Sequence, residues 1–169
     1  MGESLSFLRN SYWILRHDKS IPNENGLIVS TMANGTLEEF GLAPEGIHQA
    51  KLAGELLDKE LKARNVPIEI VQICYSPFSR TTHTAKIVAD YAEIWVLDEK
   101  VPFTSVEGGE SVADVCSRIS IALTALETAY QGCNIIFVSH GDPLQIFQTI
   151  LHAVKDKTSA EVDISSIIK

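Results

Sequence analysis

Four cationic side chains stand directly after predicted β-strands, and their residue types could do chemistry together. They are Arg16, His17, Arg80 and His140. The apolar runs that precede them span residues 12–15, 70–75 and 135–138. In an open α/β sheet, ligands bind in the crevice outside the carboxyl ends of the strands. Two arginines and two histidines at that edge would form one positive pocket, which predicts a site for a phosphoryl group.

Sequence motifs for other phosphate, nucleotide and acyl chemistry are missing. The chain has no GxxxxGKS/T loop, no GxGxxG after a strand and no GxSxG elbow. Neither histidine belongs to an HExxH motif, and Cys74, Cys116 and Cys133 form no CxxC pair. We therefore expect no metal and no cofactor, and the best nucleophile of the pocket is an imidazole.

The charge balance limits the kind of partner. The formal net charge is −8, from 14 basic and 22 acidic residues. Nucleic acids and membrane surfaces are polyanionic, so neither is expected as a partner. A small phosphorylated substrate remains compatible with a locally basic pocket. The chain shows neither a signal peptide pattern nor an apolar run of transmembrane length, which favours a cytoplasmic location.

Apolar periodicity predicts an alternation of strands and helices. Strands are expected near 12–15, 68–75, 93–97 and 134–138, with a further edge strand at 162–168. Helices are expected near 44–64, 81–91, 111–130 and 142–154, and long loops at 18–44 and 98–109. This alternation predicts an α/β fold, a three-layer α/β/α sandwich around a mostly parallel central sheet. The length of 169 residues suits a single domain over residues 1–169.

Three local features add detail to this pattern. Gly54 is expected to let the helix 44–64 pack closely on the sheet. Asp142 is expected to cap the last helix, with Pro143 in its first turn. The apolar residues 27–29 interrupt a polar stretch and are expected to form a short packing segment.

Four motifs occur in order between residues 15 and 150. They are LRH at 15–17 with Asn23 six residues after the histidine, SPFSRTTHTA at 76–85, GGES at 108–111 and SHG at 139–141. A helix entry with Leu42, Gly46, Gln49 and Ala50 lies before the second motif. Taken in this order, they resemble the signatures of the histidine phosphatase superfamily, specifically its phosphoglycerate-mutase-like branch.

The resemblance implies a role for each matching residue. His17 would be the nucleophile that takes the phosphoryl group, with His140 as a second catalytic histidine. Arg16, Asn23, Arg80 and His140 would bind the phosphate oxygens. The family also uses a carboxyl general acid, and Glu99 matches its LxE pattern best, with Glu107 as the alternative. A solvated loop carboxylate is the competing interpretation of Glu99.

One position departs from the family pattern. Where the family has Arg-His-Gly, this chain has Arg16-His17-Asp18. A carboxylate beside the pocket would repel a phosphate dianion and raise the pKa of His17. Alternatively, Asp18 points away, or it pairs with Lys19 or with an amine of the substrate.

The function predicted from these residues is that of a metal-independent phosphatase, a phosphoric monoester hydrolase that acts through a phosphohistidine on His17. Two alternatives stay open. One is a non-catalytic or weakly active phospholigand-binding protein, in which Asp18 has weakened the chemistry. The other is a mutase-type phosphotransferase, which would need a closed site that excludes water from the intermediate.

Overall fold

The computed structural model describes residues 8–94 and 111–156. The strands are β1 (Ser11–Arg16), β2 (Val71–Tyr75) and β3 (Asn134–Ser139). The long helices are α3 (Pro44–Ala63), α4 (Ser79–Ala92), α5 (Val112–Ala129) and α6 (Gly141–Asp156). The short helices are α1 (Ile21–Glu24), α2 (Met32–Gly35), and the 3-10 turns η1 (Glu38–Phe40) and η2 (Ile68–Ile70).

The three described strands form one parallel sheet in the order β1-β3-β2. Arg16 of β1 lies opposite Ser139 of β3, and Tyr75 of β2 lies opposite Val138. All three carboxyl ends therefore meet at one edge of the sheet. Strand β3, in the centre, is buried along Ile135–Val138, as expected of a parallel strand covered on both faces.

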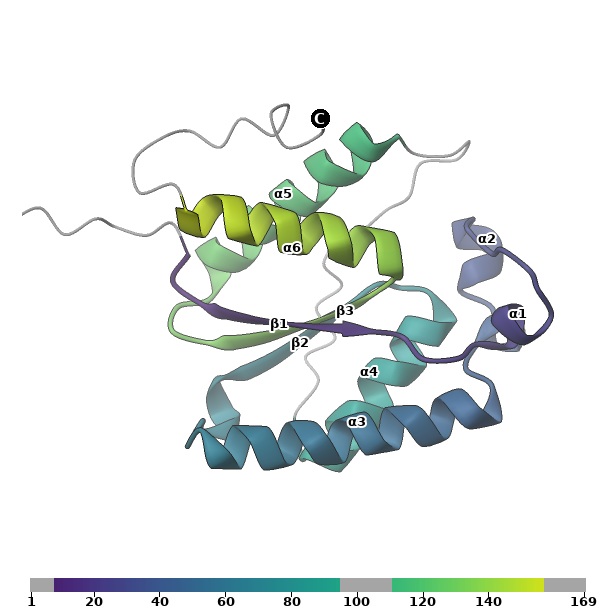
Figure 1. Ribbon diagram of the computed structural model, residues 1–169, viewed down its shortest axis with the longest axis horizontal. Coiled ribbons are helices and arrows are strands. Elements are labelled where there is room, and N and C mark those ends of the chain that lie inside the picture. Colours follow the sequence, from purple (N-terminus) through teal and green to yellow (C-terminus); the bar gives the residue numbers. More distant parts are fainter. Residues whose placement is uncertain (1–7, 95–110, 157–169) are drawn as a thin grey trace, which may run out of the picture.

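Helices cover both faces of the sheet (Figure 1). Helices α5 and α6 pack on one face, in a core centred on Phe137 and Phe147, whose rings stack at 4.4 Å. Helices α3 and α4 cover the other face, in a core that includes Ile73, Ile136 and Val138. This is the expected three-layer α/β/α arrangement, which places every long helix outside the sheet and leaves its carboxyl edge free to hold a site.

The long polar stretch 18–44 differs from its expected loop character, because it contains the short helices α1, α2 and η1. The expectation that residues 27–29 form a packing segment is wrong. The left-handed Gly26 (φ +64°) follows α1, and the amide of Leu27 donates back to the carbonyl of Pro22. Leu27 and Ile28 consequently project from this turn and are 52% and 94% exposed.

Gly54 brings α3 onto a neighbouring helix, so its expected contact with the sheet is wrong. A Cβ at this position would lie 2.6 Å from the Cβ of Tyr91 and 3.1 Å from the carbonyl oxygen of Val88, both in α4. The last helix also begins one residue earlier than expected, at Gly141, so that Asp142 lies in its first turn.

Several sequence expectations fall wholly or partly outside the described residues. Glu93 ends α4 in a left-handed conformation (φ 56°), so the strand expected at 93–97 does not begin there, and its residues 95–97 lie outside. The expected loop 98–109 and the expected edge strand 162–168 also lie outside the described part of the chain.

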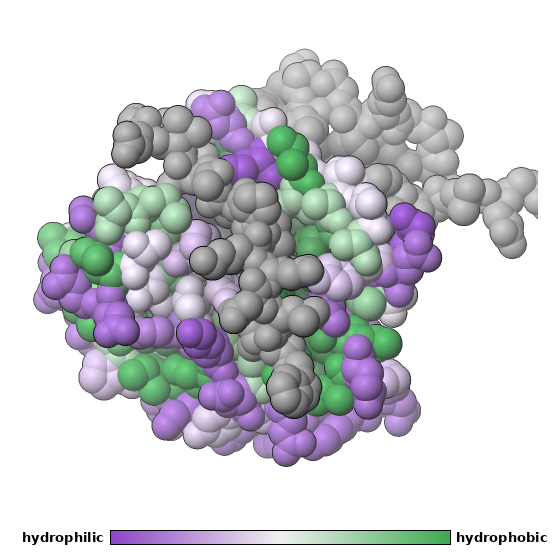
Figure 2. Space-filling model, turned by 180° about the vertical axis from the view of Figure 1, so that it is seen from behind, coloured by the Kyte–Doolittle hydropathy of each residue, from purple (hydrophilic) through white to green (hydrophobic). Residues whose placement is uncertain are grey.

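The surface bears on the expected partners. Seen from behind, the visible face carries hydrophilic residues around most of its rim, with hydrophobic residues between them (Figure 2). Among residues 8–94 and 111–156, no helix combines the length and apolar character that crossing a bilayer requires.

Candidate active site

The backbone continues the parallel ladder by one residue beyond two of the strands. The amide of His17 donates to the carbonyl oxygen of Ser139 at 3.1 Å, and the amide of Ser76 donates to that of Val138 at 3.1 Å. These bonds fix His17 and Ser76 on either side of the end of β3. The sheet therefore fixes the backbone from which the site's side chains project.

The imidazole of His17 is held in one tautomer by its own neighbour. The ring is buried, and its Nδ1 lies 2.8 Å from the carbonyl oxygen of Asp18. Because a carbonyl only accepts, Nδ1 carries the proton and Nε2 keeps its lone pair. The pKa of His17 is lowered to about 4, mainly by burial and also by the charges of Arg80 and Arg16, while the hydrogen bond to the Asp18 carbonyl opposes this lowering. At neutral pH the ring is an uncharged base.

His140 lies against His17, with the two ring centroids 5.1 Å apart. Arg80 Nε donates to its Nδ1 at 3.3 Å, so the proton of the neutral ring sits on Nε2, which donates to Ser76 Oγ at 3.1 Å. Burial lowers the pKa of His140 to about 3, and the charge of Arg80 is the next cause. His140 is therefore a neutral donor at the pocket.

Arg80 is the second residue of α4 and is shared between two parts of the site. Its Nη2 donates to the carbonyl oxygen of Val29 at 3.1 Å, so it ties the segment after α1 to the pocket. Its guanidinium also lies over the ring of Phe78 at 4.9 Å. Partial burial lowers the pKa of Arg80, but from so high a starting value that it stays cationic.

Arg16 completes the cluster from the end of β1. Its side chain is exposed, and its guanidinium carbon lies 3.7 Å from the Cβ position of Gly141, at the start of α6. It lowers the pKa of both His17 and His140. The structure thus brings the four predicted cations to one place. Helices α4 and α6 also begin at this edge of the sheet, so the positive ends of their helix dipoles lie there.

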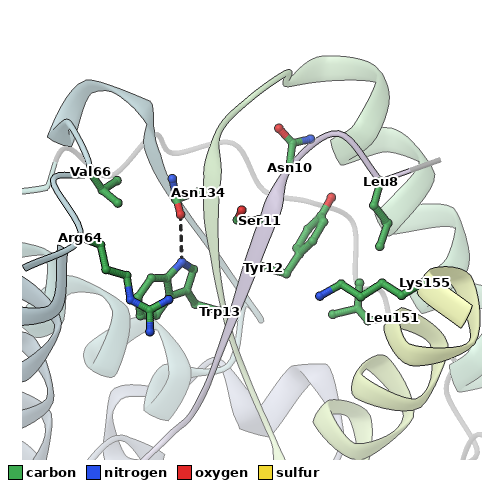
Figure 3. Close-up of a pocket in the computed structure, with 10 residues that line it drawn as sticks. All are labelled: Leu8, Asn10, Ser11, Tyr12, Trp13, Arg64, Val66, Asn134, Leu151 and Lys155. Carbon is green, nitrogen blue, oxygen red and sulfur yellow. Dashed lines mark hydrogen bonds between the residues drawn. The ribbon is translucent and has the colours of Figure 1, made fainter. Parts of the chain in front are cut away.

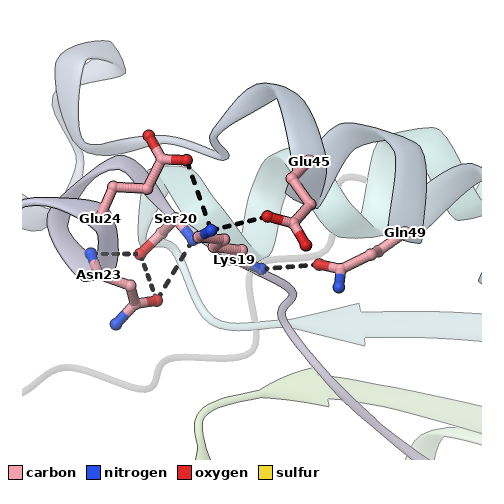
Figure 4. A network of polar contacts seen from close by, with 6 residues as sticks. All are labelled: Lys19, Ser20, Asn23, Glu24, Glu45 and Gln49. Carbon is pink, nitrogen blue, oxygen red and sulfur yellow. Dashed lines mark hydrogen bonds and ion pairs between the residues drawn. The ribbon is translucent and has the colours of Figure 1, made fainter.

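Asn23 lies in α1 and serves a different contact. Its carboxamide oxygen accepts from the amide and the hydroxyl of Ser20, and Ser20 Oγ accepts from the Asn23 amide. This reciprocal capping fixes the first turn after the His17 segment (Figure 4). The side chain is exposed, and the structure records no contact between it and the two arginines and two histidines of the site.

The segment after His17 is anchored to the start of α3, which explains the helix-entry motif. Lys19 Nζ pairs with Glu45 at 2.7 Å, and the Lys19 amide donates to Gln49 Oε1 at 3.3 Å (Figure 4). A Cβ at Gly46 would lie 2.0 Å from the Lys19 carbonyl oxygen, so only glycine allows this approach. The motif therefore positions the loop that follows the nucleophile.

The sequence expectation that Asp18 raises the pKa of His17 through its carboxylate is wrong. Only the backbone carbonyl of Asp18 acts on the ring, and burial outweighs it. Lys19 forms ion pairs with Glu45 and Glu24 and not with Asp18. Oδ2 of Asp18 is buried with no hydrogen-bond partner, and burial raises the pKa of this carboxyl group.

The predicted general acids Glu99 and Glu107 lie outside the described residues, as does the motif segment 108–110. Ser111, the last residue of that motif, caps α5 through a reciprocal pair of bonds with Asp114. Within residues 8–94 and 111–156, no three His, Cys, Asp or Glu side chains gather in a metal-binding arrangement.

Sequence analysis missed two residues that shape the site. Ser76 holds His140 Nε2, and the ring of Phe78 contacts His140 at 5.3 Å. Gly35 of α2 lies against the ring of Phe78, because a Cβ at position 35 would be only 2.8 Å from the nearest ring carbon. Ser76 and Phe78 both belong to the SPFSRTTHTA motif, so their position directly after β2 was the signal that could have identified them.

Comparison with known proteins finds one family model that matches part of the chain and solved structures that share its fold. The family model of the histidine phosphatase superfamily (branch 1) matches residues 90–166, which contain the GGES and SHG motifs but not the LRH segment. No curated protein matches the chain.

Solved structures share the fold over most of the chain. The protein of an open reading frame from Mycobacterium tuberculosis is 26% identical over 82% of this chain and 78% of its own, with a TM-score of 0.55. A phosphoglycerate mutase from Bacillus anthracis is 16% identical over 89% and 82%, with a TM-score of 0.62. A mutant phosphoserine phosphatase from Entamoeba histolytica, in complex with phosphoserine, is 18% identical over 86% and 80%, with a TM-score of 0.56.

The fold is thus that of phosphoglycerate-mutase-like proteins, a class that contains both phosphatases and mutases. The ordered motifs and the partial match of the family model make the chain similar to the histidine phosphatase superfamily (branch 1).

Proposed function

We propose that this protein is a metal-independent phosphatase that hydrolyses a small phosphate monoester through a phosphohistidine on His17. The observation that carries the proposal is the state of the His17 ring. Its Nδ1 proton is held by the Asp18 carbonyl, and its pKa is lowered to about 4. Nε2 is therefore a free nucleophilic lone pair at neutral pH.

The groups around His17 suit the charge of a phosphoryl group in transfer. Arg80 and Arg16 carry permanent positive charge, and His140 Nε2–H is a neutral donor now directed at Ser76. Phosphoryl transfer depends mainly on positioning and on neutralising the equatorial oxygens. We assign Arg16, Arg80 and His140 to those oxygens. Asn23 joins them only if its exposed amide group turns toward the ligand.

The reaction has two steps. In the first, Nε2 of His17 bonds to phosphorus as the ester P–O bond breaks, and the leaving oxygen takes the bonding electrons and a proton. In the second, a water oxygen attacks phosphorus and gives one proton to the carboxylate that donated in the first step, while the P–N bond breaks and His17 regains its lone pair. We assign the proton donor to Glu99, with Glu107 as the alternative. A positioned acid contributes roughly 10²–10⁴ in rate.

A weakly active phospholigand-binding protein is the second candidate. Asp18 stands where the family has glycine, and the family match begins at residue 90, beyond the nucleophile segment. In such a protein the cation cluster would bind phosphate while His17 turns over slowly or not at all.

The test is to detect the intermediate. The purified protein is mixed with a small aryl phosphate, quenched in base, and analysed by intact mass for an acid-labile phosphoryl adduct. We expect an adduct and turnover in the parent and in His48→Ala, an exposed histidine of α3. Both signals should be absent in His17→Ala. Equal turnover in His17→Ala would refute the mechanism, and vanadate binding without adduct or turnover would favour the second candidate.

A further inference from the structure

The connection between α1 and α2, together with α2 itself, reaches the candidate site at two points. The carbonyl oxygen of Val29 accepts a hydrogen bond from Arg80 Nη2 at 3.1 Å. Gly35 of α2 lies against the ring of Phe78, which contacts both His140 and the guanidinium of Arg80. Both short helices lie beyond the carboxyl end of β1 (Figure 1). This part of the chain therefore forms a wall beside the predicted phosphate site.

Two apolar side chains of this connection are presented to solvent by an anchored turn. Leu27 and Ile28 are 52% and 94% exposed. The Leu27 amide donates to the carbonyl of Pro22 at 2.8 Å, and the carbonyl of Val29 is held by Arg80. Ile28 thus stands between two anchored residues, next to one that contacts a predicted phosphate-binding arginine. Single exposed apolar residues are common, but an anchored apolar pair beside a pocket indicates a surface that a ligand covers.

The charge of the surrounding stretch limits what a ligand can carry besides phosphate. Residues 18–45 contain five acidic residues and one basic residue. The basic residue, Lys19, already forms ion pairs with Glu45 and Glu24. A second anionic group on the substrate would therefore meet like charge beyond the arginines of the site, whereas an uncharged group would not.

We propose that the substrate is a phosphate monoester of an apolar, uncharged alcohol, whose hydrocarbon part packs on Leu27 and Ile28. This inference rests on the proposed function, because it takes the phosphoryl group to lie among Arg16, Arg80 and His140. A hydrocarbon group that extends from there past Arg80 meets the turn at Ile28, and the contact removes apolar surface of both partners from water. Alkyl and aryl phosphates fit this description. Phosphorylated sugars and carboxylate-bearing phosphates do not.

Phosphonates test the inference without turnover, because their P–C bond is not hydrolysed. Calorimetry with the full chain compares methylphosphonate, hexylphosphonate and 6-phosphonohexanoate, whose chain ends in a carboxylate. Each buried methylene changes affinity about fourfold, so contact of two methylenes with the turn should make hexylphosphonate bind at least about tenfold more tightly than methylphosphonate. The carboxylate of 6-phosphonohexanoate should remove most of this gain.

Two matched variants locate the contact. Ile28→Ser should reduce the preference for hexylphosphonate over methylphosphonate to about threefold or less, because the hydroxymethyl group offers little apolar surface. The isoleucine is almost fully exposed, so its loss should leave the fold intact. Ile121→Ser, on the surface of α5 and 66% exposed, is the control and should keep the preference of the parent.

A second surface of the protein also combines apolar and basic side chains. An open groove of about 670 Å³ lies beside the amino-terminal half of β1, at the opposite edge of the sheet (Figure 3). Trp13, Arg64 and Leu151 are among its lining residues. Hexylphosphonate binding that survives Arg80→Met and falls in Arg64→Met would place the ligand in this groove and overturn the inference.

The remaining outcomes separate this inference from the proposed function. If the parent binds methylphosphonate but shows no preference for hexylphosphonate, the inference is wrong and the phosphate site stands. If the parent binds neither phosphonate, the phosphate site and the inference both fail. If Ile28→Ser keeps the preference and instead abolishes self-association in sedimentation, the turn contacts a second copy of the chain and the inference is overturned.

Discussion

Arg80 links the charge of the pocket to the protonation of both histidines, so replacing it by methionine tests the site directly. The side chain length is nearly kept and the charge is removed. Arg80 donates to His140 Nδ1 and to Val29, and its charge lowers the pKa of both rings. Arg80→Met should therefore change anion affinity and histidine titration together.

The expected loss follows from the kind of bond removed. A hydrogen bond to a charged group contributes about 1.5–3 kcal/mol, which is a factor of roughly 10–150 in affinity. We expect vanadate or phosphate to bind Arg80→Met more weakly by that factor, measured by calorimetry at neutral pH. The pKa values of His17 and His140 should rise from about 4 and about 3, followed by NMR of the imidazole protons.

Arg64→Met is the matched control, because Arg64 lies at the opposite, amino-terminal edge of the sheet. It should leave both measurements unchanged. If Arg80→Met binds vanadate as tightly as the parent and neither histidine titrates differently, Arg80 does not face the anion site and the assignment of the cluster is wrong.

Three further results are expected. Because folding lowers the pKa of His17 and His140, the unfolded chain binds more protons between about pH 6.5 and 4. Stability should therefore fall as the pH falls through that range, measured by urea unfolding. Asp18→Asn should stabilise the fold by about 1 kcal/mol at pH 7, since it removes a buried charge whose Oδ2 has no partner. That gain should shrink toward low pH, where the parent carboxyl is protonated, and a constant gain would contradict the reasoning. Glu127→Ala should cost about 3 kcal/mol, because the buried carboxylate accepts bonds from the Arg9 amide, Asn10 and the Tyr12 hydroxyl. The exposed Glu60→Ala should change thermal stability little, and a similar loss in both variants would count against this role.

The local sequence determined the main elements and the edge at which the candidate site would form. Apolar runs at 12–15, 70–75 and 135–138 are long enough and apolar enough to be strands of a parallel sheet. The carboxyl ends of parallel strands lie at one edge of the sheet. The residues that follow these strands therefore lie near one another, independently of the conformation of the loops. This is why Arg16, His17, Arg80 and His140 could be grouped from sequence alone.

Other features depended on contacts between distant segments. Leu27 and Ile28 face solvent because a turn at Gly26 directs them outward, and periodicity carries no information about such a turn. Gly54 contacts α4 instead of the sheet, since the partner of a small residue is set by how helices cross.

The protonation of the site was likewise decided by tertiary structure. From sequence, an adjacent carboxylate predicts a raised pKa for His17. In the fold, burial and two arginines lower that pKa, and Asp18 acts only through its carbonyl. Sequence reveals which charges are neighbours along the chain. Burial, and the direction in which a side chain points, are set only when the sheet and helices close around it.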